Sequence, residues 1–160
     1  MTETKRKSEM VIRRAEKKDE TAIEIILSTY FLDRDDIPHD RFYIAEVNGK
    51  VVGCAVFEKL QTVESREIFY EIHTIAVMPS YKEKGYGGLL LNRLETEIKK
   101  LKTDEKEKSS DEIFTRTTAS GFFIHEGFSK SGAEKTKYWN ECVRCGKIEI
   151  CSQTVLSKKI

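Results

Sequence analysis

An apolar strand pattern that runs directly into a glycine-rich turn and an amphipathic helix is the feature that most restricts the fold of this chain. The stretch from Ile72 to Leu91 reads IHTIAVMPSYKEKGYGGLLL. Pro79 ends the strand pattern because proline has no backbone N–H to donate. Gly85 and Gly87 allow a tight turn whose backbone N–H groups lie at a helix N-terminus, where the helix dipole favours anions. The stretch predicts a phosphate-binding turn, although its six central residues alone also fit an ordinary strand-to-helix turn.

The other elements follow from hydrophobic periodicity and turn signals. Asp19 is placed to cap a helix that continues to Tyr30. Asn48-Gly49 between two β-rich runs predicts a tight hairpin. The strands expected are 11–13, 42–47, 51–58, 68–77, 112–116 and 154–156, and the further helices are a long one from residue 87 and a short one over 118–126. This order predicts one mixed α/β domain over residues 11–160 after a loose N-terminal tail, 1–10.

Composition excludes several classes of function. The 160 residues contain 28 basic and 27 acidic side chains, a formal net charge of +1, which argues against a nucleic-acid binder. The chain has no run of about 18 apolar residues, so we expect no membrane span. The charged N-terminus lacks the apolar core of a signal peptide, and we expect a cytoplasmic protein.

The phosphate turn and its surroundings resemble the acetyl-CoA site of the GNAT superfamily of N-acetyltransferases. Lys82-Glu83-Lys84-Gly85-Tyr86-Gly87 is similar to the family pattern of Arg or Gln, two residues, Gly, one residue, then Gly or Ala, with lysine in the first place. The resemblance covers roughly Val11 to Phe128. It implies the GNAT fold, a central and mostly antiparallel sheet with flanking helices. It also implies transfer of an acetyl group from acetyl-CoA to an amine. A Walker-type turn is excluded because no Gly-Lys-Ser/Thr ends this one, and the third glycine of a Rossmann fingerprint is absent.

The resemblance also implies which residues bind the cosubstrate. The backbone of the strand end would pair with the pantetheine arm, with the Val77 N–H directed at the thioester carbonyl, and the turn would hold the pyrophosphate. The predicted acetyl-CoA-binding residues are Ile75, Ala76, Val77, Lys82, Glu83, Lys84, Gly85, Tyr86, Gly87 and Gly88.

Acetyl transfer to an amine requires a base, and Glu71 is the candidate. In the family an acidic residue on the strand before the turn often acts as general base through water. Period-two alternation puts Glu71 and His73 on one strand face, although Glu71 also fits a salt-bridged strand residue. Many relatives protonate the leaving thiolate with a tyrosine, but the matching residue here is Phe123, which has no proton to give and fits a core aromatic. Ser120 or water would then supply that proton.

The expected acceptor is the amino group of a small molecule such as an amino acid. Arg116 could bind an acceptor carboxylate through both guanidinium nitrogens, as could Arg41, although either arginine also fits a surface residue. His73 is a further acceptor-binding candidate. Residues 31–41 would line the acceptor site. Thr117-Thr118-Ala119 and the C-terminal tail are similar to stand-alone prokaryotic amino-acid N-acetyltransferases, including those that acetylate glutamate. The alternatives are an acetyltransferase of protein or peptide N-termini and a non-catalytic module that binds CoA or metal.

Three cysteines near the C-terminus suggest a metal site. Cys142, Cys145 and Cys151, in the segment 137–152, supply three of the four ligands of a structural zinc ion. A redox pair and unliganded cysteines are the alternatives. Cys54 fits a small core residue on its strand. We also expect a homodimer.

Overall fold

A computed structural model of the protein describes residues 9–160. The predicted tail, 1–10, lies outside the described residues except for its last two, and Met10 already belongs to a strand. The chain divides into two compact units. The first unit holds the described residues up to Val56 together with Thr74–Leu94, and the second unit holds Phe57–His73 and Glu95–Ile160. That residues 11–160 form a single domain stays a prediction.

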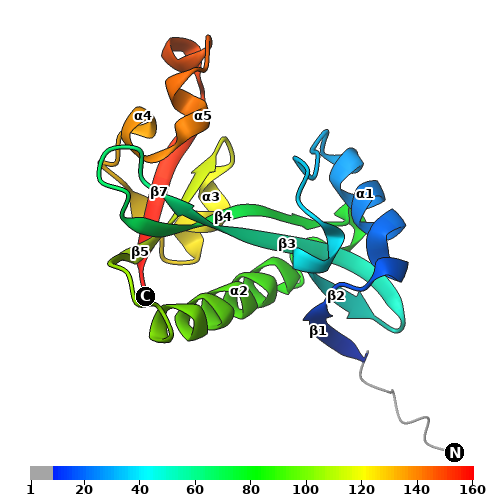
Figure 1. The fold of residues 1–160 in the computed structure, drawn as a ribbon. Coiled ribbons are helices and arrows are strands. Elements are labelled where there is room, and N and C mark those ends of the chain that lie inside the picture. Colours follow the sequence, from blue (N-terminus) through cyan, green and yellow to red (C-terminus); the bar gives the residue numbers. More distant parts are fainter. Residues whose placement is uncertain (1–8) are drawn as a thin grey trace, which may run out of the picture. The chain divides into compact units, whose positions relative to one another are not determined.

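Within residues 9–160, seven strands form one mixed sheet in the order β1-β2-β3-β4-β5-β7-β6 (Figure 1). Their bounds are Met10–Arg14, Tyr43–Val47, Lys50–Gln61, Ile68–Val77, Ser109–Thr117, Ser129–Lys130 and Thr154–Lys159, for β1 to β7 in turn. β1 with β2, β2 with β3, β5 with β7 and β6 with β7 are antiparallel, and β4 with β5 is parallel. The predicted fold, a mostly antiparallel sheet with helices, is confirmed.

Helices connect these strands. The α-helices are α1 Glu20–Thr29, α2 Tyr86–Thr103, α3 Ser120–His125, α4 Lys135–Tyr138 and α5 Asn140–Val143. The described part of the chain also contains four short 3₁₀ helices, η1 Lys17–Asp19, η2 His39–Arg41, η3 Pro79–Tyr81 and η4 Ile148–Ile150. The elements α4, α5 and β6 were not predicted, because a segment of four residues or fewer is too short to show hydrophobic periodicity.

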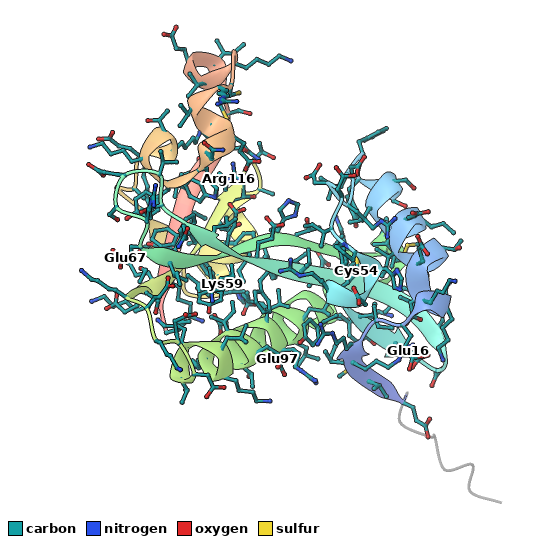
Figure 2. All side chains as sticks on the ribbon, viewed as in Figure 1. Glu16, Cys54, Lys59, Glu67, Glu97 and Arg116 are labelled. Carbon is teal, nitrogen blue, oxygen red and sulfur yellow. The ribbon has the colours of Figure 1, made fainter. Side chains whose placement is uncertain are left out.

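In the first unit, α1 packs its apolar face on the β2–β3 hairpin. Ile23, Ile26 and Leu27 of α1 are buried in one cluster with Ile44 of β2 and Cys54 of β3. The hairpin turn is the predicted Asn48-Gly49, with φ angles of 49° and 81°, as a type I′ turn requires. The prediction of Cys54 as a core residue is confirmed, and Figure 2 labels it within this unit.

The predicted helix at residues 20–30 is present, but Asp19 does not cap it in the expected way. No side-chain capping hydrogen bond is made at the start of α1. The Asp19 carboxylate instead accepts hydrogen bonds from Nη1 and Nη2 of Arg13 at 2.7 and 3.0 Å, and one from the backbone N–H of Glu16 at 2.8 Å. A buried carboxylate is stabilised more by a guanidinium than by one helix N–H, so Asp19 ties β1 to the start of α1.

The second unit has an aromatic core between the sheet and the C-terminal segment. Phe69 of β4 and Phe114 of β5 meet edge-to-face, with ring centroids 5.8 Å apart. Trp139 lies 5.4 Å from Phe69, also edge-to-face, and is 2% exposed. Cys142 is buried in the same cluster. These contacts anchor the segment of α4 and α5 on strands β4 and β5.

Candidate active site

The end of β4 in the first unit is held from two sides. The Met78 N–H donates to the Val52 carbonyl oxygen at 2.8 Å, and the Tyr30 hydroxyl donates to the Val77 carbonyl oxygen. Gly53 lies against this strand end: a Cβ added there would meet Leu90 Cδ1 at 3.1 Å and the Ala76 carbonyl oxygen at 3.2 Å. The predicted cosubstrate strand, Ile75–Val77, is therefore packed closely between β3 and the start of α2.

The predicted phosphate turn leads from η3 into α2. Its residues 82–85 are exposed, and Gly85 has a left-handed φ of 84°. The Leu89 N–H donates to the Gly85 carbonyl oxygen at 3.1 Å, so helical bonding starts at the glycine. Glu83 also has a positive φ, 64°, which costs free energy in a residue with a Cβ. An exposed turn at the N-terminus of an 18-residue helix is suited to bind a phosphate group.

Lysines surround the tyrosines beside this turn. Lys82 Nζ lies 4.7 Å from the ring centroid of Tyr30, and Lys84 Nζ lies 5.5 Å from that of Tyr81. Lys50 Nζ lies 5.6 Å from the same Tyr81 ring. Sequence reasoning missed Lys50, because it is 32 positions before Lys82 and reaches the turn only through the fold. The three cations add positive charge beside the candidate phosphate site.

In the second unit, Glu71 and Arg116 form a two-point ion pair. Glu71 Oε2 accepts from Arg116 Nε at 2.7 Å, and Oε1 accepts from Nη2 at 3.0 Å. The parallel register sets this pair, since Glu71 lies opposite Phe114 and Arg116 is two residues further along β5. The Glu71 side chain is 2% exposed and that of Arg116 12%. The two residues that the sequence assigned separately to base and acceptor binding are thus direct partners.

Three further groups contact the Arg116 guanidinium from the C-terminal segment. Arg116 Cζ lies 4.6 Å from the centroid of the Trp139 ring, a cation–π contact. Nη1 donates to Cys142 Sγ at 3.4 Å, and Nη2 forms an ion pair with the exposed Glu141. Figure 2 shows Arg116 at the foot of α5. The Arg116 side chain is therefore largely buried and contacts four other side chains. It is not the exposed surface residue that the sequence also allowed.

Burial and the neighbouring charges shift the pKa values of both members of this ion pair. Burial raises the pKa of Glu71 above its ordinary value, and the nearby Arg116 guanidinium opposes that rise. The pKa of Arg116 is raised further above its already high value, because its two carboxylate partners outweigh the burial that would lower it. The net direction makes the Glu71 carboxylate more basic than that of an exposed glutamate. Such a group can accept a proton from a bound amine.

The loop after α1, predicted to line the acceptor site, forms an open polar hollow in the first unit. Arg34 in this loop pairs with Glu20 at 3.2 Å and with Glu24 at 3.1 Å. Arg41, the second candidate for an acceptor carboxylate, lies exposed in η2. The hollow is lined by Glu24, Leu27, Leu32, Asp33, Arg34 and Asp36.

Phe123 has the packing of a core residue. It is 8% exposed, with its ring centroid 5.1 Å from that of Phe122 and 5.2 Å from that of Phe128. The prediction of a core aromatic is confirmed. Ser120, at the start of α3, is half-buried, and its part in proton transfer stays a prediction.

The predicted zinc site at Cys142, Cys145 and Cys151 is not supported. Within residues 9–160, no three His, Cys, Asp or Glu side chains are grouped so that they could hold a metal ion. Cys142 is buried under Arg116, whereas Cys145 is exposed. Cys151 Sγ accepts from Lys135 Nζ at 3.3 Å. Cys142 packs in the core with Trp139, whereas Cys145 and Cys151 keep contact with solvent.

No helix in the described part of the chain is long and apolar enough to cross a membrane.

A family model and two related proteins all indicate the same family for this chain. Residues 9–112 match the model of the Acetyltransferase (GNAT) family. An uncharacterised N-acetyltransferase of Chlorobaculum tepidum is 30% identical over 127 residues, which are 78% of this chain and 74% of that protein. An amino-acid acetyltransferase of Mycobacterium tuberculosis is 29% identical over 141 residues, 81% of this chain and 74% of that protein.

A solved structure shares the fold. N-acetylglutamate synthase from Neisseria gonorrhoeae, in complex with coenzyme A and N-acetyl-glutamate, superposes with a TM-score of 0.73 at 20% identity. The match covers 96% of this chain but 36% of the neisserial one, so the chain spans about a third of that protein's length. At this identity the likeness establishes the fold.

Proposed function

The chain belongs to the GNAT acetyltransferase family, and from this premise we propose that it transfers the acetyl group of acetyl-CoA to the amino group of an amino acid. The observation that carries the choice of acceptor is the Arg116 guanidinium, held beside Glu71 in the second unit. A guanidinium next to the candidate base offers a carboxylate-binding group close to the point where the amine must lose its proton. The amino-acid acetyltransferase among the relatives supports the same choice.

In the proposed reaction the turn at residues 82–88 binds the pyrophosphate of acetyl-CoA through backbone N–H groups and the α2 dipole. Lys50, Lys82 and Lys84 contribute positive charge. The β4 backbone at Ile75–Val77 holds the pantetheine arm, and the Val77 N–H polarises the thioester carbonyl, as the family resemblance implies. The neisserial structure of the same fold, solved in complex with coenzyme A, supports acetyl-CoA as the cosubstrate.

The chemical step forms a C–N bond and breaks a C–S bond. Glu71, directly or through one water, takes a proton from the ammonium group of the acceptor, and the neutral amine attacks the thioester carbonyl carbon. As the tetrahedral intermediate expels the thiolate of CoA, its nitrogen loses a second proton, and this proton is the one that reaches the sulfur. Because Phe123 has no proton to give, water or Ser120 protonates the thiolate, a tolerable leaving group since a free thiol has a pKa of about 8.5.

The test is acetyl-CoA turnover, followed as release of free thiol, across amino acids, polyamines and peptides with free N-termini. A single amino acid, or a small related group, should stimulate thiol release well above the rate without acceptor. Preferential turnover of peptides would contradict the acceptor assignment and favour an N-terminal acetyltransferase. Tight acetyl-CoA binding with no stimulating amine would favour a non-catalytic module. A cytoplasmic location and a homodimer stay predictions from the sequence.

A further inference from the structure

Arg116 holds two carboxylates that differ in their environment. The Glu71 side chain is 2% exposed and is bound through two nitrogens, whereas the Glu141 side chain is 66% exposed and is paired through Nη2. Glu71 lies on a central strand, and Glu141 lies in α5, a single helical turn. One partner of the guanidinium is thus fixed and the other is placed to leave.

The geometry of a guanidinium explains why this difference matters. Arginine presents its five N–H donors in a planar fork with two edges that can each bind a carboxylate. Glu71 occupies the Nε–Nη2 edge of Arg116. On the other edge Nη2 meets one oxygen of Glu141, and Nη1 meets Cys142 Sγ, which is a weak acceptor. A carboxylate that bound both nitrogens of this edge would satisfy it better than its present partners do.

Arg116 does not need Glu141 to keep its position. The two-point bond to Glu71 and the Trp139 ring 4.6 Å away hold the guanidinium from two directions. An ion pair to a side chain as exposed as Glu141 contributes little to stability. Release of Glu141 would therefore open the edge without loosening the arginine.

We propose that Glu141 is a built-in stand-in for the carboxylate of the acceptor, which occupies the outer edge of Arg116 in the free enzyme and is displaced when the acceptor binds. This inference rests on the proposed function, since it takes the acceptor to be an amine that carries a carboxylate. Glu141 competes from within the same chain, so it weakens the binding of every carboxylate ligand. Competition with Glu141 therefore favours ligands whose carboxylate binds both Nη1 and Nη2 of Arg116.

The test compares Glu141→Ala with Glu149→Ala, a matched control that removes an exposed glutamate from the same C-terminal segment. The probe is glutarate, a dicarboxylate with no amine to acetylate, and its dissociation constant is measured by calorimetry. Glu141→Ala should bind glutarate about two- to fivefold more tightly than the wild-type protein, the range expected for release of one exposed ion pair. Glu149→Ala should bind it as the wild-type protein does. Equal or weaker binding by Glu141→Ala would overturn the proposal.

A second comparison ties the effect to Arg116. In an Arg116→Lys background the planar fork is absent, so Glu141→Ala should no longer tighten glutarate binding. If Glu141→Ala tightened glutarate binding equally in that background, the proposal would be overturned, because the loss of one negative charge would explain the effect without the arginine. Glutarate binding needs no turnover, so the proposed function fails separately, when no amino acid stimulates thiol release. For any amino acid that is turned over, Glu141→Ala should lower its KM and leave the KM of its α-carboxamide unchanged.

Discussion

The Glu71 carboxylate on β4 is bound by both Nε and Nη2 of Arg116 on β5, at 2.7 and 3.0 Å. Because β4 and β5 are parallel neighbours, the fold itself brings these two residues together, 45 positions apart in the chain. The pair joins a candidate proton acceptor to a candidate anion binder. Substitution of either residue alone therefore separates the two roles.

Glu71→Gln removes the base while keeping the size of the side chain and one acceptor for Arg116. We expect kcat to fall by about 10²-fold or more, the usual contribution of a positioned base, with little change in acetyl-CoA affinity. Burial raises the pKa of Glu71, so the wild-type rate should rise with pH through a value above that of an ordinary glutamate, and this limb should vanish in the variant. Thiol release across pH checks both expectations. Glu64→Gln, an exposed acid in the β3–β4 turn, is the control; an equal loss there would contradict the assignment.

Arg116→Lys keeps the charge but removes the fork. A single ammonium cannot reproduce both bonds to Glu71 and the contact with Trp139, so a charged hydrogen bond is lost. We expect the free energy of unfolding to fall by about 1.5–3 kcal/mol, measured by urea denaturation at neutral pH. Arg144→Lys, at an exposed arginine of the same segment, should change stability by much less. Equal stability of the two variants would show that the planar guanidinium of Arg116 contributes nothing to the free energy of unfolding.

Gly53→Ala tests the packing of β3 against the cosubstrate strand. The added Cβ would lie 3.1 Å from Leu90 Cδ1 and 3.2 Å from the Ala76 carbonyl oxygen, so the strand end or α2 must shift. Overpacking of this kind costs about 1–3 kcal/mol, and it should also weaken acetyl-CoA binding. Gly132→Ala is the control, because nothing lies within 4 Å of a Cβ there. Thermal unfolding of both variants decides between a clash and a general effect of glycine replacement.

Local signals in the sequence predicted much of the fold and the family. The strand 68–77 is present as β4, and the Asn48-Gly49 turn has the positive φ angles that the dipeptide favours. The match of residues 9–112 to the GNAT family model confirms the family expected from the phosphate turn. These features depend on neighbours within a few residues, which periodicity and turn chemistry report directly.

Features that depend on distant residues were not predictable in this way. The sequence marked Asp19 as a helix cap, but Arg13 takes its carboxylate once β1 and α1 pack together. It marked Cys142 as a zinc ligand, but burial beside Trp139 gives that thiol a place in the core. Periodicity carries no information on which side chain a buried charge will meet, so such partners emerge only from the fold.

Thiol labelling tests the arrangement of the cysteines. Cys54 is fully buried, and burial raises its pKa to about 12, so it should stay unmodified in the native protein. Cys151 should react readily, because the Gln153 N–H and the Lys135 ammonium lower its pKa, and the exposed Cys145 should also react. Mass spectrometry after brief alkylation identifies the labelled sites. A bound metal would instead protect Cys142, Cys145 and Cys151 together until a chelator was added.

Asp19→Asn tests the ion pair that ties β1 to α1. The Arg13 guanidinium holds the pKa of Asp19 below its usual value, against the opposing effect of burial. A carboxyl with a lowered pKa in the folded state stabilises the fold above its unfolded pKa of about 3.9, and the stabilisation is lost as pH falls through the folded value. We therefore expect Asp19→Asn to lower the free energy of unfolding by about 1–3 kcal/mol at neutral pH. The difference from the wild-type protein should shrink towards zero as the solution becomes strongly acidic.

The control for the pH dependence of Asp19→Asn is Asp40→Asn, which removes an exposed carboxylate from the same unit. Urea unfolding curves collected from neutral pH to below pH 3 give the free energy of unfolding for the three proteins. Asp40→Asn should follow the wild-type protein at every pH, because an exposed carboxyl gains little from folding. A gap between Asp19→Asn and wild type that persisted unchanged in acid would mean that Asp19 acts through its shape and hydrogen bonding. The charge it shares with Arg13 would then not be what stabilises the start of α1.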